Sequence, residues 1–194
     1  MIKNILLDLD GTLTDPKVGI TTSARYGLDK IGYPVDDSTN LDWIIGPPLK
    51  ASLAKILNVD LSDDLAEQAL LGYRERFSAI GLYENEVYPT VVETLEKLKE
   101  KKYQLFLATA KPTIYAKQIL EHFNLAHYFN EIYGSELSGE RTNKGDLITY
   151  ILEQIVFASY PKAHYDFGHR KILNALLPFL IHLQLSLLLH FLDD

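Results

Sequence analysis

The sequence predicts an α/β fold in which a parallel sheet carries a small helical domain, inserted after the first strand. Apolar runs typical of buried strands lie at Asn4 to Leu9 and Tyr103 to Ala108. A short third strand with its turn at Gly134 is predicted over Glu131 to Gly134, and helical patterns lie between the strands. Strands that alternate with helices form parallel sheets. Residues 16–86 contain helical patterns only, which predicts a separate domain there and a main domain made of residues 1–15 and 87–194.

Composition limits the function classes. The chain has 194 residues, of which 47% are hydrophobic and 23% charged, as is usual for a globular protein. Its net charge of −7 argues against nonspecific nucleic-acid binding, which needs a basic surface. Because there is no cysteine, disulfides, thiolate nucleophiles and cysteine zinc sites are excluded. The first residues enter a strand without a leader-like segment, so we expect a cytoplasmic protein.

The first strand ends on two carboxylates, Asp8 and Asp10, which a glycine turn at Gly11 follows. In open α/β sheets the carboxyl ends of the strands bind ligands. Two neighbouring acids repel each other, and a divalent cation or a shared proton relieves that repulsion. The alternative is that both carboxylates simply stabilise the turn.

The inserted region is predicted to hold helices over Lys17 to Gly32 and Leu49 to Leu57, and a third that Ser62 caps and that runs through Phe77. Gly46-Pro47-Pro48 forms a rigid elbow before the second of these helices. Stacked over the end of the first strand, such a domain would act as a lid that excludes water from the site.

The second strand ends in Thr109-Ala110-Lys111, after a helix predicted from Thr90 to Lys101. A hydroxyl group and free backbone N–H groups at a strand end are suited to bind a phosphate or an oxyanion. Threonine is also common at strand ends for structural reasons. Lys111 is predicted to be a solvated lysine at the start of the helix over Thr113 to Phe123.

Lys144 begins a helix after the polar loop 135–142, which follows the third strand. A lysine at a helix N-terminus works against the helix dipole. A phosphate or a carboxylate partner would compensate for that placement, so Lys144 is a candidate binding residue. His122 and His127 lack the spaced partners of a metal site and are predicted to be packing or surface residues.

Three of these motifs resemble the signatures of the haloacid dehalogenase-like hydrolases. Asp8-Leu9-Asp10-Gly11-Thr12-Leu13-Thr14-Asp15 matches the first signature, and Thr109 and Lys144 fall where the second and third are expected. The helical insert and its Gly-Pro-Pro elbow are similar to the cap of the phosphoglycolate-phosphatase-like branch. The resemblance implies a Rossmann-like, three-layer parallel sheet core with an all-helical cap.

It also implies Mg²⁺-dependent hydrolysis of a small phosphorylated metabolite. By the resemblance, Asp8 attacks phosphorus to form an aspartyl-phosphate and Asp10 acts as acid and base. A carboxylate oxygen of Asp8 and the backbone carbonyl of Asp10 hold Mg²⁺. Phosphate is bound by Thr109, Ala110 and Lys144. The resemblance also offers an alternative to a solvated Lys111, since a lysine two residues after the threonine is common in this branch and would add positive potential to the site. The expected substrate is a small acid such as 2-phosphoglycolate, with nucleoside 5′-monophosphates and pyrophosphate as alternatives.

The fourth signature, an apolar strand followed by Gly-Asp, is missing from the C-terminal segment. Asp166 precedes Gly168, and His169 stands where the next acid is expected. From Ile155 to Asp194 only six of forty residues are charged, and half of residues 173–192 are leucine. We interpret this segment as a shifted reading frame or as a natural tail that packs on the core or on a partner chain. A membrane span is disfavoured by its polar residues, and a non-catalytic, phosphate-binding relic remains the rival to an enzyme. The oligomeric state is not predicted.

Overall fold

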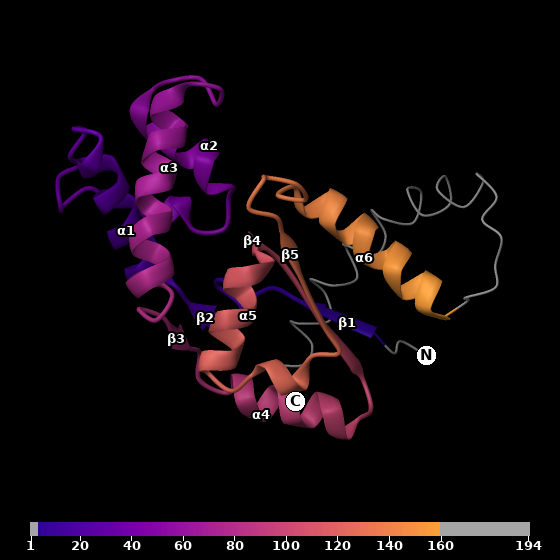
Figure 1. The fold of residues 1–194 in the computed structure, drawn as a ribbon. Helices are drawn as coiled ribbons and strands as arrows, with labels where there is room; N and C mark the ends of the chain where they lie inside the picture. Colours follow the sequence, from indigo (N-terminus) through magenta and orange to yellow (C-terminus); the bar gives the residue numbers. More distant parts are fainter. Residues whose placement is uncertain (1–3, 160–194) are drawn as a thin grey trace. The chain divides into compact units, whose positions relative to one another are not determined.

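The computed structural model describes residues 4–159, with the side chains of residues 4–155 (Figure 1). The chain divides into two compact units, Met1–Leu147 and Ile148–Asp194. Asp166, His169 and the leucine-rich residues 173–192 lie outside the described residues. All residues of the candidate site belong to the first unit.

A parallel three-stranded sheet forms the centre of the first unit, which confirms the predicted α/β fold. Its strand order is β1 (Asn4–Leu7), β4 (Gln104–Pro112) and β5 (Glu131–Ser135). β4 is the middle strand and pairs in parallel with both neighbours. β4 extends four residues beyond the predicted end at Ala108, and its register with β5 shifts between Ala108 and Pro112. The end of β4 is therefore irregular where the predicted phosphate-binding residues lie.

The helical segment is inserted between two short antiparallel strands, β2 (Thr14–Asp15) and β3 (Glu86–Val87). The helices follow β2, and the paired two-residue strands bring the two ends of the inserted segment together. Between them lie α1 (Lys17–Lys30), η1 (Asp42–Ile44), α2 (Leu49–Leu57), α3 (Asp64–Arg76) and a π-helical turn η2 (Phe77–Gly81).

Helix α3 begins one residue later than predicted. The Asp63 side chain, and not that of Ser62, accepts a hydrogen bond from the backbone N–H of Leu65 at 2.8 Å. A carboxylate at this position both satisfies a free N–H group and complements the helix dipole.

Helices α1 and α3 cross closely through two glycines. A Cβ atom on Gly27 would lie 2.4 Å from the carbonyl oxygen of Ala69 and 2.6 Å from the backbone nitrogen of Tyr73. A Cβ atom on Gly72 would lie 2.9 Å from the Cα of Gly27. The absence of side chains at both positions lets the two backbones approach, and this contact fixes the residues that α3 presents to the site.

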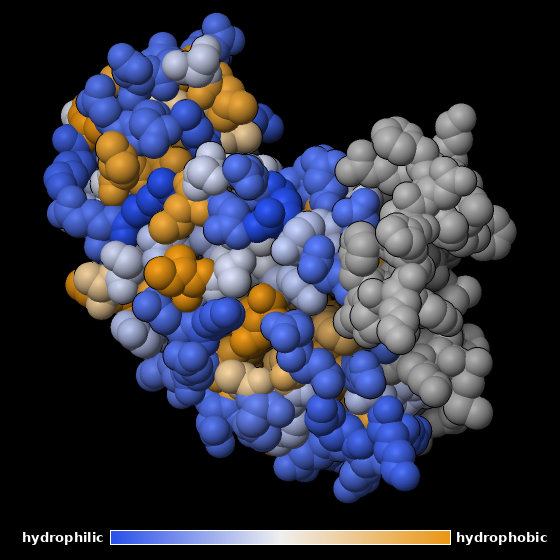
Figure 2. Space-filling model, turned by 45° about the vertical axis from the view of Figure 1, so that its right-hand side comes forward, coloured by the Kyte–Doolittle hydropathy of each residue, from blue (hydrophilic) through white to orange (hydrophobic). Residues whose placement is uncertain are grey.

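The remaining described elements are α4 (Val91–Glu100), α5 (Thr113–His122), η3 (Ala126–Tyr128) and α6 (Lys144–Ser159). α5 packs against β4 and β5. The interior is formed by apolar side chains of the sheet and helices, among them Leu105, Leu107, Ile119 and Leu120. On the face drawn in Figure 2, apolar side chains lie interspersed with polar ones. Within residues 4–159, no helix is both long enough and apolar enough to cross a bilayer.

Candidate active site

The turn after β1 places Asp8 and Asp10. The buried carbonyl oxygen of Leu9 accepts the backbone N–H groups of residues 12–14 at 2.9 to 3.2 Å. Gly11 has a φ of +74°, in the left-handed region that glycine adopts without strain. Three hydrogen bonds to one carbonyl make the turn rigid, so the backbone fixes the positions from which the two carboxylate side chains extend.

Asp8 has a fixed orientation and a cationic partner. Its Oδ1 accepts the backbone N–H of Leu9 at 2.9 Å, and its Oδ2 forms an ion pair with Nζ of Lys144. Both side chains remain partly exposed. The position of Lys144 at a helix start predicts either a phosphate or a carboxylate partner. The structure shows a carboxylate, that of Asp8. The role of Lys144 in binding phosphate stays a prediction.

Asp10 is more deeply placed, and its partner is Lys111. The side chain of Asp10 is 12% exposed and that of Lys111 4%, with 3.1 Å between Oδ2 and Nζ. The Lys111 ammonium also lies 4.5 Å from the centroid of the Phe77 ring. The prediction of a solvated Lys111 is therefore wrong, because its side chain turns inward to a carboxylate. Burial raises the pKa of the Asp10 carboxyl, and the positive charge of Lys111 opposes that rise.

The end of β4 is held by hydrogen bonds that leave its polar groups pointing to the site. The Thr109 hydroxyl oxygen accepts the backbone N–H of Lys111 at 3.2 Å. The Ser135 hydroxyl donates to the carbonyl of Ala110 at 2.8 Å, and the Thr113 hydroxyl donates to the carbonyl of Ser135 at 3.2 Å. A hydroxyl that accepts one hydrogen bond still has its own proton to donate. Thr109 therefore retains the donor that anion binding needs.

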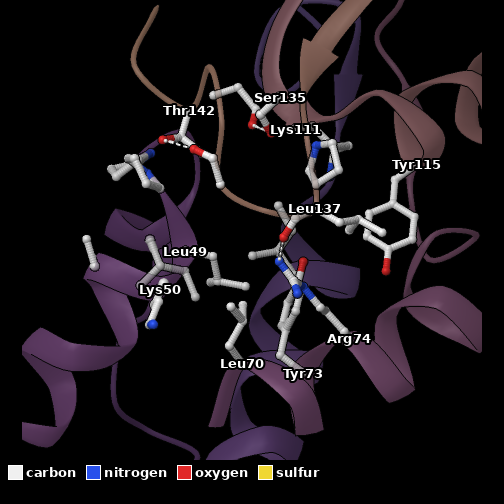
Figure 3. A pocket seen from close by; sticks show the side chains of 18 of the residues that line it. Leu49, Lys50, Leu70, Tyr73, Arg74, Lys111, Tyr115, Ser135, Leu137 and Thr142 are labelled. Carbon is white, nitrogen blue, oxygen red and sulfur yellow. Dashed lines mark hydrogen bonds between the residues drawn. The ribbon is translucent and has the colours of Figure 1, made fainter. Parts of the chain in front are cut away.

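A cavity of about 560 Å³ connects these strand ends with the helical segment (Figure 3). Four of the predicted site residues line it, namely Asp8, Asp10, Thr109 and Ala110. Lys144 is not on its wall and reaches it only through Asp8. The helical segment supplies the opposite wall with Leu49, Lys50, Leu70, Tyr73, Arg74 and Phe77.

The two cationic side chains on that opposite wall each have one described partner. Lys50 pairs with Glu67 at 2.7 Å, so the charges of this pair offset each other. Arg74 donates a hydrogen bond to the carbonyl oxygen of Leu137 at 2.8 Å, which Figure 3 shows as a dashed line. Arg74 thereby connects α3 to the loop after β5 by a single hydrogen bond.

Aromatic rings form the inner part of the wall. Tyr73 stacks on Phe77 with ring centroids 5.0 Å apart, and Tyr115 meets Phe77 edge-on at 5.5 Å. Burial, with a contribution from the charge of Asp10, raises the pKa of Tyr73 well above its ordinary value. These rings were not predicted to belong to the site. The i, i+4 spacing of Tyr73 and Phe77 on one helix face was the only signal available, and it is equally typical of a core.

The described residues fit Mg²⁺ as a partial site. Among residues 4–159, no three side chains of the kinds that bind metals cluster together. A carboxylate oxygen of Asp8 and the backbone carbonyl oxygen of Asp10 are hard donors of the kind that Mg²⁺ prefers, and they leave the Asp10 carboxyl free. Mg²⁺ is commonly held by one or two carboxylates together with substrate phosphates and water. The pair therefore suits a site that the substrate completes.

Comparisons with known proteins agree on one family. The profile of the haloacid dehalogenase-like hydrolases matches residues 5–160. A 5′-nucleotidase of Pseudomonas aeruginosa is 44% identical over 150 residues, which are 77% of this chain and 67% of that protein. Tyrosine-protein kinase PtkA of Mycobacterium tuberculosis is 34% identical over 151 residues, and the match spans 78% of this chain but only half of PtkA.

Phosphoglycolate phosphatases are more distant. That of Vibrio parahaemolyticus is 29% identical over 161 residues, 79% of this chain and 70% of that protein. Among solved structures, a predicted phosphatase from Clostridium acetobutylicum is 44% identical, with a TM-score of 0.75 over 80% of this chain and 71% of that one.

Proposed function

The chain belongs to the haloacid dehalogenase-like hydrolase family as one of its phosphatases, and we propose that its substrates are nucleoside 5′-monophosphates. The observation that carries the proposal is the cavity. Its volume of about 560 Å³ lies within the range of roughly 300–1,000 Å³ typical of sites for drug-sized ligands. Phosphoglycolate would leave most of that space empty, whereas a nucleoside monophosphate would occupy much more of it. The similarity to a 5′-nucleotidase supports the same choice.

The arrangement of the walls suits such a substrate. The phosphate would lie at the strand ends, near Asp8 and Thr109, and the nucleoside would extend along the wall that α3 contributes. Leu70 and Tyr73 give that wall an apolar and aromatic surface, on which a base can pack. Arg74 and Lys50 at its edge supply polar groups that can contact the ribose or the base.

In the proposed reaction an Asp8 carboxylate oxygen attacks phosphorus, and the bond between phosphorus and the ester oxygen breaks as the aspartyl-phosphate forms. Asp10 gives its proton to the leaving ester oxygen. Water then attacks phosphorus, Asp10 takes a proton from it, and the bond to Asp8 breaks to release phosphate. Burial raises the pKa of Asp10, which favours the protonated carboxyl that the first step requires.

The phosphoryl oxygens would be bound by the Thr109 hydroxyl, the backbone N–H of Ala110 and the ammonium of Lys144. The ion pair between Lys144 and Asp8 keeps a positive charge beside the attacking carboxylate. Mg²⁺, held in the proposed site by a carboxylate oxygen of Asp8 and the backbone carbonyl of Asp10, would neutralise negative charge on the phosphoryl group.

Phosphate release from a panel of substrates tests the proposal. The full chain with Mg²⁺ would be assayed on adenosine, guanosine and uridine 5′-monophosphates, 2-phosphoglycolate and pyrophosphate, with Asp8→Asn and a chelator-treated sample as controls. We expect the highest kcat/KM on a nucleoside monophosphate and no turnover by Asp8→Asn. A higher kcat/KM on 2-phosphoglycolate or pyrophosphate would overturn the substrate class. Turnover that does not depend on Asp8, or none on any substrate, would favour the non-catalytic relic.

The similarity to phosphoglycolate phosphatases supports a second candidate, hydrolysis of 2-phosphoglycolate. Here a cation on the helical wall would bind the substrate carboxylate, and Arg74 suits that role because its described hydrogen bond goes to a neutral carbonyl, whereas Lys50 pairs with Glu67. Arg74→Gln would then raise KM for 2-phosphoglycolate much more than KM for a nucleoside monophosphate.

A further inference from the structure

Lys111 lies between the Asp10 carboxylate and an aromatic ring of the helical segment. Its Nζ is 3.1 Å from Oδ2 of Asp10 and 4.5 Å from the centroid of the Phe77 ring. A buried ammonium is costly unless a paired charge or a π face compensates for its lost hydration. Asp10 belongs to the turn after β1 and Phe77 to η2, so two separate parts of the chain stabilise this one charge.

The backbone around Lys111 is fixed by contacts within β4 and with β5. Its N–H donates to the Thr109 hydroxyl oxygen, and the preceding carbonyl of Ala110 accepts from Ser135. A Cβ atom on Gly134 would lie only 2.4 Å from the carbonyl oxygen of Lys111, so strand β5 supports this backbone at very close range. The position of Lys111 is therefore built into the fold and does not depend on a flexible surface side chain.

Lys111 occupies only one of the two oxygens of Asp10. Oδ2 contacts the ammonium, while Oδ1 is buried and has no hydrogen-bond partner within the described residues. When one oxygen of a carboxyl group is held in this way, the direction of the other oxygen is fixed as well. Oδ1 is therefore the oxygen left to exchange a proton with a substrate.

We propose that Lys111 is a positioning residue for Asp10 and that the Phe77 ring makes this positioning depend on the packed helical segment. The proposal rests on the proposed phosphatase function. The O–H bond on Oδ1 breaks as the leaving ester oxygen takes the proton, and the proton lost by the attacking water returns to Oδ1. Lys111 keeps Oδ1 directed at the reacting oxygens through both steps. When η2 moves away, the ammonium loses the ring that covers it and the carboxylate loses its fixed orientation.

The leaving group provides the test, because p-nitrophenolate departs without a proton and a nucleoside alkoxide does not. We would compare kcat/KM on adenosine 5′-monophosphate and on p-nitrophenyl phosphate for Lys111→Met, Lys111→Arg and Phe77→Leu. Positioned proton transfer contributes about 10²–10⁴-fold to rates. We expect Lys111→Met to lose about 10-fold to 100-fold more on the nucleotide than on the nitrophenyl ester. Lys111→Arg should restore most of that loss, and Phe77→Leu should show a smaller loss of the same kind. Equal losses on both substrates would overturn the proposal, since they indicate a general binding or folding defect.

Thermal unfolding of the metal-free protein tests the same contact without turnover. Removing one partner of a buried ion pair leaves an uncompensated charge, so Lys111→Met and Asp10→Asn should each lower Tm. The double variant should lower Tm by less than the sum of the two shifts. The pair Lys111→Met with Glu93→Gln, whose exposed carboxylate pairs with Lys97 on α4, serves as the control and should give additive shifts. Additive shifts for Lys111 and Asp10 would refute the contact. Inactivity of the unmodified chain on both substrates would refute the proposed function alone, and the unfolding cycle would still decide whether Lys111 holds Asp10.

Discussion

Replacing Gly27 by alanine should destabilise the protein, although alanine is the better helix former. Gly27 lies inside α1, where exchanging glycine for alanine gains about 0.5–1 kcal/mol of helix propensity. The new Cβ would, however, lie 2.4 Å from the Ala69 carbonyl oxygen and 2.6 Å from the Tyr73 nitrogen. Both are backbone atoms, so no side-chain rotation can relieve the overlap. Overpacking a core costs typically about 1–3 kcal/mol, and a clash between two backbones belongs at the upper end. The net loss should therefore be about 1–2 kcal/mol.

Urea unfolding of Gly27→Ala measures this loss, with Leu71→Ala as the matched control on the solvent side of α3. Leu71 is 55% exposed, and surface substitutions of this kind usually change stability by less than about 0.5 kcal/mol. Because the clash displaces the backbone of Tyr73, Gly27→Ala should also raise KM on the preferred substrate. A Gly27→Ala protein at least as stable as the parent chain would refute the account of the α1–α3 contact.

Three further predictions concern charged groups of the helical segment. The Arg76 guanidinium donates hydrogen bonds to Glu84 from two nitrogens, at 2.7 and 2.9 Å, and lowers the pKa of that carboxyl. The stability that this contact contributes is present above the unfolded-state pKa of Glu84 and is lost as the pH falls through its folded-state pKa. The stability of Glu84→Gln, measured by urea unfolding, should therefore depend less on pH in the acid range than that of the parent chain. Arg25 donates hydrogen bonds to four backbone carbonyl oxygens of the loop after α1. Because lysine lacks the planar guanidinium fork, Arg25→Lys should lose about 1–3 kcal/mol of stability and speed proteolysis of that loop. Equal cleavage rates for the variant and the parent chain would contradict the role of these hydrogen bonds in holding the loop. Arg74→Gln should raise KM with little change in kcat, because the hydrogen bond to Leu137 holds the cavity wall and not the reacting atoms; a lower kcat at unchanged KM would show the opposite.

The strand ends could be predicted because the residues that determine them are adjacent in the sequence. An apolar run that leads into Asp8-Leu9-Asp10-Gly11 specifies both a strand and the turn at its end, and the apolar run before Thr109 likewise specifies a strand and its polar end. Lys144 could be assigned a charged partner from its position against the helix dipole, and the structure places it on Asp8. For the strand ends, neighbours in sequence determine the environment, whereas for Lys144 the helix start indicated only the kind of partner, because Asp8 is 136 residues away in sequence.

Lys111 could not be predicted in the same way. Its partners Asp10 and Phe77 are distant in sequence, and only the pairing of β4 with β1 and the placement of η2 bring them together. A lysine at a helix start is normally solvated, so the local pattern favoured the wrong environment. The aromatic wall was missed for a related reason, since a helix face that carries Tyr73 and Phe77 has the same periodicity whether it covers a core or a cavity.

Several glycines determine where the site residues lie, although glycine has no side chain that could react or bind. The sequence predicted Gly134 as the turn that ends the third strand, but it lies within β5, and its contact with the carbonyl of Lys111 requires the lack of a side chain. Gly27 and Gly72 do the same for the helix that presents Tyr73. A glycine that permits a close approach and a glycine that permits a left-handed turn, such as Gly11, look identical in a sequence. The separation of Asp10 from its lysine and of the cavity wall from the strand ends is therefore set by residues whose role only the packed structure reveals.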